Sequence, residues 1–66
     1  MVSKKLSIGE WRKAIGMSRE ALAAACEVSV TTIRNWEENP KSIGIDKAFA
    51  IADAFKVSIL EIDFGI

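Results

Sequence analysis

Histidine is absent from this chain of 66 residues, and cysteine and proline occur once each. A single cysteine cannot form an internal disulfide, which fits a reducing cytoplasm. Without histidine or a second cysteine, no structural zinc site is expected, and nothing in the chain calls for another metal or a cofactor. The sequence offers no nucleophile with a matching base, so we do not expect an enzyme.

Long hydrophobic runs and a charge surplus are also missing. The longest apolar run is Ala21–Cys26, which is far too short for a membrane span or a signal-peptide core. We therefore expect no membrane association and a cytoplasmic location. Nine Lys and Arg balance nine Asp and Glu, but residues 1–41 hold seven of these cations against five acids. The front of the chain is thus mildly basic and the tail mildly acidic, whereas nucleic-acid binders usually carry a basic surplus.

The composition is that of a folded chain. Half of the residues are apolar and 27% are charged, which is typical of a globular domain rather than a disordered segment. A chain of this length buries roughly 60% of its unfolded surface on folding, enough for one core. We expect residues 1–66 to form a single domain, with no second domain for a ligand or effector.

Helix starts are the clearest local pattern. A serine N-cap accepts a hydrogen bond from a first-turn amide, and apolar residues just before the cap and four positions after it pack together. This arrangement recurs at Ser7, Ser18, Ser29 and Ser58. The first and last of these serines also have glutamate three positions later, which completes a capping box. Gly44 is expected to cap another helix, with Asp46 in its first turn.

Between these starts the apolar spacing is helical rather than alternating. In the fourth segment, Phe49, Ile51, Ala52 and Phe55 form the apolar stripe, and the only proline falls in the loop before it. No strand pattern is present. We predict an all-α protein with five helices, at about 7–14, 18–25, 29–38, 45–55 and 58–63.

The second and third predicted helices are joined by a very short turn. The turn covers Cys26 to Val28, so the two helices must cross steeply, and Ala23 and Ala24 supply small residues where they touch. The core residues expected to fill this wedge are Leu22, Cys26, Val28, Ile33 and Trp36. This layout predicts a helix-turn-helix at about 18–38, whose second helix presents its N-terminal face to the DNA major groove.

The same region resembles the lambda repressor/Cro (XRE-type) DNA-binding family. The resemblance is carried by Met17 to Glu37, MSREALAAACEVSVTTIRNWE, by the preceding WRKAIG, and by the later AIADAFKVSILEI. It therefore extends over nearly the whole chain. It implies a compact five-helix lambda-repressor-like domain that binds double-stranded DNA and regulates transcription.

The resemblance also implies DNA contacts from three segments: the start of the second helix, the exposed face of the third, and the loop that follows. The residues are Ser18, Arg19, Ser29, Val30, Thr31, Arg34, Asn35, Lys41 and Ser42. Arg34 suits guanine and Asn35 suits adenine or a phosphate, whereas Val30 and the Thr31 methyl suit thymine methyl groups. The amides next to Ser18 add an anion site at a helix start.

Five other positions are expected to have structural roles. Arg12 and Glu37 match a pair that bridges the first and third helices in relatives. Glu27 stands where the family usually has glycine in the turn, and Lys56 replaces the usual glycine after the fourth helix. A left-handed backbone costs a non-glycine residue roughly 1 kcal/mol, so both positions should be strained. Trp11 is expected to be half-buried.

The C-terminal tail is more apolar than its length requires. Ile62 is expected to cover the core of the domain itself. In the family the last helix often forms a twofold dimer that sets two recognition helices about 34 Å apart. The residues expected to form such a homodimer, at least on DNA, are Ile59, Leu60, Phe64 and Ile66.

The leading hypothesis is a Cro-like regulator of the kind found in phages or prophages. It would repress transcription by binding a palindromic operator through the helix that starts at Ser29. The alternative is a protein-interaction module, anti-repressor or antitoxin-like, whose apolar tail binds another regulator protein. The absence of net charge favours this alternative. The same absence of net charge predicts a modest salt dependence for any DNA binding.

Overall fold

A computed structural model describes residues 5–65 and shows a helical protein. The elements follow one another as α1 (Ile8–Ile15), α2 (Arg19–Cys26), α3 (Val30–Glu38), the 3₁₀ turn η1 (Pro40–Ser42), α4 (Ile45–Phe55) and the 3₁₀ turn η2 (Ile59–Glu61). Over residues 5–65 the only β-type pairing is one isolated bridge between Leu6 and Ile62. The predicted all-α class is confirmed.

The helices begin at the predicted caps. Ser7 accepts a hydrogen bond from the Glu10 amide, and the Glu10 carboxylate accepts one from the Ser7 amide, which completes a capping box. Ser18 and Ser29 cap α2 and α3 through their hydroxyl oxygens, and Gly44 caps α4 without a side-chain bond. The serine hydroxyls accept hydrogen bonds from first-turn amides that have no partner inside the helix. The local sequence therefore determines where these helices start.

The predicted fifth helix at 58–63 is wrong. Ser58 and Glu61 do form the expected capping box, but the segment makes only the short turn η2. At Ile62, the next residue, the backbone is extended. The Leu6 amide donates to the Glu61 carbonyl at 3.3 Å, and the Asp63 amide donates to the Leu6 carbonyl at 2.8 Å. The C-terminal tail thus hydrogen-bonds to the backbone of Leu6, just before α1, instead of continuing a helix.

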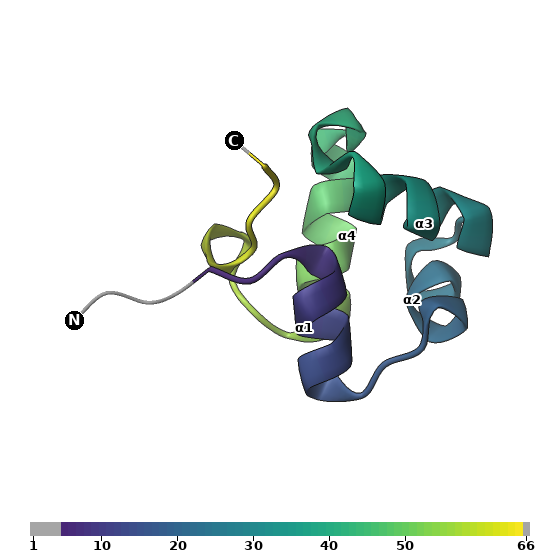
Figure 1. Cartoon of the computed structure of the whole chain (residues 1–66), viewed down its shortest axis with the longest axis horizontal. Helices are drawn as coiled ribbons and strands as arrows, with labels where there is room; N and C mark the ends of the chain where they lie inside the picture. The colour runs from purple at the N-terminus through teal and green to yellow at the C-terminus, as the bar shows by residue number, and fades with distance from the viewer. Residues whose placement is uncertain (1–4, 66) are drawn as a thin grey trace.

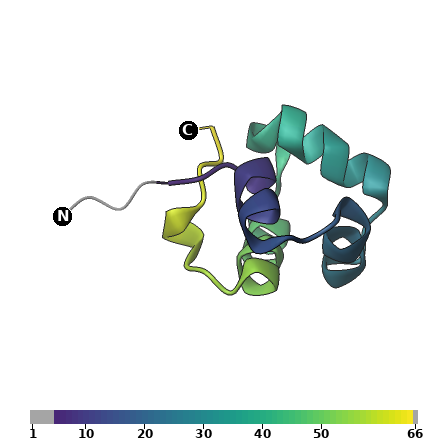
Figure 2. The ribbon, with the colours of Figure 1, turned by 60° about the horizontal axis from the view of Figure 1, so that its bottom comes forward.

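The core lies where α2, α3 and α4 meet, with α1 packed on α3 and α4. Its most completely buried members include Leu22, Ile33 and Ile51. Cys26 and Trp36 are buried there too, as predicted, and so is Ile62 from the tail. Figures 1 and 2 both place α2 and the start of α3 at one end of the molecule and η2 at the other.

Within residues 5–65, two non-glycine residues hold a left-handed backbone. Glu27, at the end of α2, has φ 59° and Lys56, at the end of α4, has φ 60°. Both positions were expected to be strained because glycine is the usual residue there. At Glu27 the conformation lets the Val28 amide donate to the Ala23 carbonyl at 3.0 Å, which closes α2 and turns the chain toward α3.

Candidate nucleic-acid interface

The third helix has one buried face and one open face. Ile33 and Trp36 lie in the core, with exposed fractions of 0% and 8%. On the opposite side Thr31, Arg34 and Asn35 are exposed. Positions three and four apart share a helix face, so these three side chains form one outward stripe. The buried pair holds α3 in place, and the stripe is free to meet a ligand.

Two predicted reading residues are less available than the sequence suggested. Val30 is half-buried and packs against the core, so only part of its side chain faces outward. The Ser29 hydroxyl accepts a hydrogen bond from the Thr32 amide at 3.1 Å and lies 3.0 Å from the Thr32 hydroxyl. Its oxygen therefore serves the start of α3. Thr31, Arg34 and Asn35 are left as the exposed centre of the stripe.

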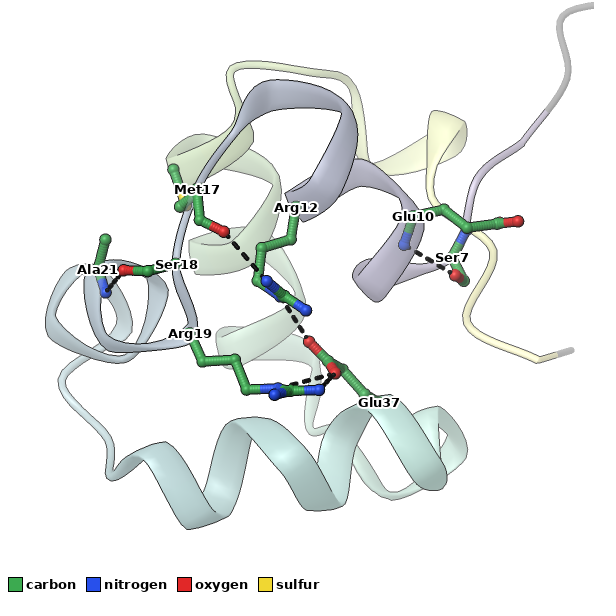
Figure 3. A network of polar contacts seen from close by, with 8 residues as sticks. All are labelled: Ser7, Glu10, Arg12, Met17, Ser18, Arg19, Ala21 and Glu37. Carbon is green, nitrogen blue, oxygen red and sulfur yellow. Dashed lines mark hydrogen bonds and ion pairs between the residues drawn. The ribbon is translucent and has the colours of Figure 1, made fainter.

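The start of α2 carries a polar network (Figure 3). Glu37 of α3 accepts from Arg12 Nε through Oε2 at 2.9 Å, and Arg12 Nη1 also donates to the Met17 carbonyl at 3.2 Å. The other carboxylate oxygen, Oε1, accepts from Arg19 Nε at 3.2 Å and Nη2 at 3.1 Å. The structure thus brings together Arg12 and Glu37, the pair that the family resemblance implied.

Sequence reasoning missed the contact between Arg19 and Glu37. The two residues lie on different helices, 18 positions apart, and no local spacing rule connects them. A pattern that places Arg19 near DNA says nothing about which side chain holds it. Only the crossing of α2 and α3 brings the guanidinium and the carboxylate together.

The third predicted segment is the turn η1, directly after α3. Lys41 and Ser42 are both exposed there. The Ser42 hydroxyl donates to the Asn39 carbonyl at 2.8 Å, so it helps to close the turn. Lys41 therefore sits at the end of α3 opposite the Ser29 cap, and Arg19 lies beside α3 at the start of α2.

The single cysteine is a core residue. Burial raises the pKa of the Cys26 thiol above its ordinary value of 9.0, and the nearby positive charge of Lys47 lowers it by less. Lys47 Nζ also donates to the Cys26 carbonyl at 2.9 Å, at the end of α2.

Within residues 5–65 no cluster of three or more metal-ligating side chains is present, and none of the helices there combines the length and apolarity needed to cross a bilayer.

The apolar tail divides into covered and open residues. Ile59 and Phe64 are half-buried against the core, and Leu60 is 76% exposed; Ile66 lies outside the described residues. An open groove of about 490 Å³ runs beside Leu60, Phe64 and Ile43. Ile45 of α4 also lines the groove and is 67% exposed.

One apolar residue of α4 does not face the core as expected. Phe49 is 53% exposed, whereas Ile51, Ala52 and Phe55 of the same predicted stripe are buried. The core contacts of α4 come from α2, α1 and η2, and they leave the side of the helix that carries Ile45 and Phe49 open. These two residues are four positions apart, so they share one exposed face.

A short helix, a turn at residues 27–29 and a second helix with an open polar face define a helix-turn-helix DNA-binding protein. A family profile described as Helix-turn-helix (HTH_3) matches residues 8–62. The chain therefore belongs to this XRE/lambda Cro-like helix-turn-helix family, whose members are DNA-binding transcription regulators and typically not enzymes. No curated protein and no solved structure matched the chain.

Proposed function

We propose that this protein is a Cro-like repressor that binds a palindromic operator as a homodimer. The observation that carries the proposal is the open stripe of α3, on which Thr31, Arg34 and Asn35 are exposed. The opposite face of that helix is locked in the core by Ile33 and Trp36. A rigid helix with an unobstructed polar face meets the requirement for entering a major groove.

The side chains of the stripe divide the work of base recognition. Arg34 offers two parallel N–H donors to guanine O6 and N7, and Asn35 offers a donor and an acceptor to adenine. The Thr31 methyl group, with the exposed part of Val30, packs on thymine. These contacts discriminate between bases because each edge in the major groove has its own pattern of donors and acceptors.

Phosphate-backbone contacts from α2 and η1, the elements before and after α3 in the chain, would fix the position of the helix on the duplex. Ser18 and Arg19 at the start of α2 provide one, where unpaired amides of the first turn favour an anion. Lys41 and Ser42 of η1 provide the other. Phosphate contacts of this kind position the protein without reading the sequence.

The homodimer would form through the apolar tail: Ile59, Leu60, Phe64 and Ile66. Support comes from Leu60, which exposes 76% of its surface beside an apolar groove. A twofold arrangement places two copies of α3 about 34 Å apart, one DNA turn, and this spacing makes the operator an inverted repeat.

Selection of bound sequences from a random duplex pool, at fixed salt, tests this function. We expect an inverted repeat with half-sites one turn apart to be enriched. Arg34→Ala and Thr31→Ala should lose the enrichment, and Lys56→Ala, which removes one cation from the far end of α4, should keep it. No enrichment by the wild-type chain would contradict the proposal.

A protein-interaction module is the second candidate, favoured by the open Leu60 and the absence of net charge. In that case the tail would bind another regulator protein in the manner of an anti-repressor or antitoxin. Leu60→Lys separates the two functions. If it abolishes a complex with a partner protein while the wild-type chain selects no DNA, the interaction module is the correct function.

A further inference from the structure

Glu37 of α3 pairs with two arginines, Arg12 of α1 and Arg19 of α2. Glu37 uses its two oxygens separately, one for Arg12 and one for Arg19. The side chains of Arg12 and Glu37 are 11% and 13% exposed, whereas that of Arg19 is 39% exposed. The carboxylate is therefore paired in the interior and extends its other oxygen to an arginine at the surface.

The charges in this network do not cancel. Two guanidinium groups share one carboxylate, so the cluster keeps one positive charge, and the exposed partner is Arg19. The buried charge of Glu37 is already matched by Arg12, which the Met17 carbonyl also fixes. The surplus positive charge consequently lies at the first residue of α2, beside the positive end of that helix.

The geometry of the contact also leaves part of the Arg19 guanidinium available. Nε and Nη2, on one edge of the planar group, both point to Glu37 Oε1. Over the described residues, Nη1 has no protein acceptor. Because guanidinium is a rigid fork, fixing one edge also fixes the direction of the other. Figure 3 shows Arg12 and Arg19 approaching Glu37 from two different elements.

We propose that Glu37 is a positioning residue for DNA binding: from α3 it holds the Arg19 guanidinium so that the free end, with Nη1, meets a backbone phosphate. This inference rests on the proposed function. It ties the proposed phosphate contact of Arg19 on α2 to a side chain of α3, the helix proposed to read the bases.

A purely stabilising role explains the contact less well. An ion pair with one partly exposed partner adds little to folding stability, because water screens it and the side chain loses freedom. Glu37 already has a nearly buried partner in Arg12. Holding Arg19 in one conformation has its main effect when a ligand arrives, since the ordering has then been completed before binding.

Two double-mutant cycles on the selected duplex test the role of Glu37. Arg19→Ala should weaken binding by about tenfold and lower the salt slope by about 1. Glu37→Gln should weaken binding in the wild-type background and have little further effect once Arg19 is alanine. The matched cycle of Glu37→Gln with Arg34→Ala should be additive. Additive effects in the Arg19 cycle would overturn the proposal.

Glu37→Gln leaves one acceptor oxygen for two guanidinium groups, so folding must be checked by thermal melting. If this variant does not fold, Arg19→Lys decides: lysine keeps the charge but lacks the fork. We expect its binding to be as weak as that of Arg19→Ala, and affinity equal to wild type would refute the positioning role. Specific binding that depends on Arg34 but not on Glu37 would sink this inference alone, whereas no specific binding at all would sink the proposed function as well.

Discussion

Glu27 illustrates how one residue can oppose its local backbone. Its φ of 59° is normal for glycine and costly for a residue with a Cβ atom. The conformation persists because the Leu22 and Cys26 side chains on one side and Val28 on the other hold the turn between two packed helices. The strain is part of how this chain makes the turn.

Replacing Glu27 with glycine should therefore stabilise the protein. We expect the free energy of unfolding to rise by about 0.5–1 kcal/mol, the relief of left-handed strain less the extra flexibility of glycine in the unfolded chain. Urea unfolding measures the change. Glu27→Ala, which keeps the Cβ atom, is the control and should give no such gain; equal effects of the two variants would refute the strain.

The Cys26 thiol should make the free energy of unfolding change with pH in the alkaline range. Its folded pKa lies above the ordinary 9.0 because of burial, so the unfolded chain loses the thiol proton first. The contribution of the thiol to stability is complete below the unfolded pKa and is lost as pH rises through the folded pKa. The stability difference between wild type and Cys26→Ala should therefore narrow above pH 9.0.

Urea unfolding of both proteins at neutral pH and at several values above 9.0 checks this expectation. Alkylation gives a second measurement, since the thiolate is the reactive form. Iodoacetamide should modify native Cys26 slowly and the urea-unfolded chain quickly. A constant stability difference at all pH values, together with rapid native labelling, would show that the thiol is not shielded.

At the scale of elements, α3, the proposed recognition helix, depends on its first turn. The Ser29 oxygen accepts from the Thr32 amide, and Thr31 and Arg34 follow within that turn and the next. Without the cap, first-turn amides lose their partner and the turn frays. The outward stripe of α3 therefore depends for its fixed conformation on the Ser29 hydroxyl, although that hydroxyl bonds to the helix backbone.

Ser29→Ala should lower the free energy of unfolding by about 1 kcal/mol, the usual loss for a removed cap. Ser29→Asn, which can accept the same hydrogen bond, should keep most of the stability. Thermal melting of the two variants provides the comparison. Equal melting temperatures for Ala and Asn at this position would show that the cap does not stabilise α3.

At the scale of the whole molecule, the neutral charge shapes how the proposed regulator binds. With no net charge, each proposed subunit would neutralise few phosphates, so non-specific binding should be weak and the salt slope modest. Affinity for an operator would then come from joining two subunits. The open apolar surface around Leu60 is the place where such a joint is expected.

Leu60→Lys tests the proposed dimer interface with little risk to the fold, because Leu60 is already 76% exposed. We expect the variant to bind a single half-site as well as wild type but to lose cooperative binding to the inverted repeat. Ile15→Lys, at an exposed apolar position on α1, is the matched control. Gel-shift titration and sedimentation measure both properties, and unchanged cooperativity would place the dimer contact elsewhere.

Features that depend on neighbours within one helical turn could be predicted from the residues alone. The serine caps, the Gly44 start of α4 and the short turn before Ser29 follow from hydrogen bonds and contacts between residues at most a few positions apart. The outward stripe of α3 follows as well, because helical periodicity separates Thr31 and Arg34 from the buried positions. Such interactions form whenever the chain is helical.

Contacts between segments far apart in the chain arise only when the helices pack together. The Trp11 indole donates to the Glu61 carbonyl at 2.9 Å, and the Leu6 backbone bonds to Glu61 and Asp63, so Ile62 is extended instead of helical. Phe49 is 53% exposed, whereas Ile51, Ala52 and Phe55 of the same helix are buried, and only the packing of α4 in the fold separates them. Arg19 and Glu37 meet only where two helices cross, and a contact set by that crossing leaves no pattern in the order of residues.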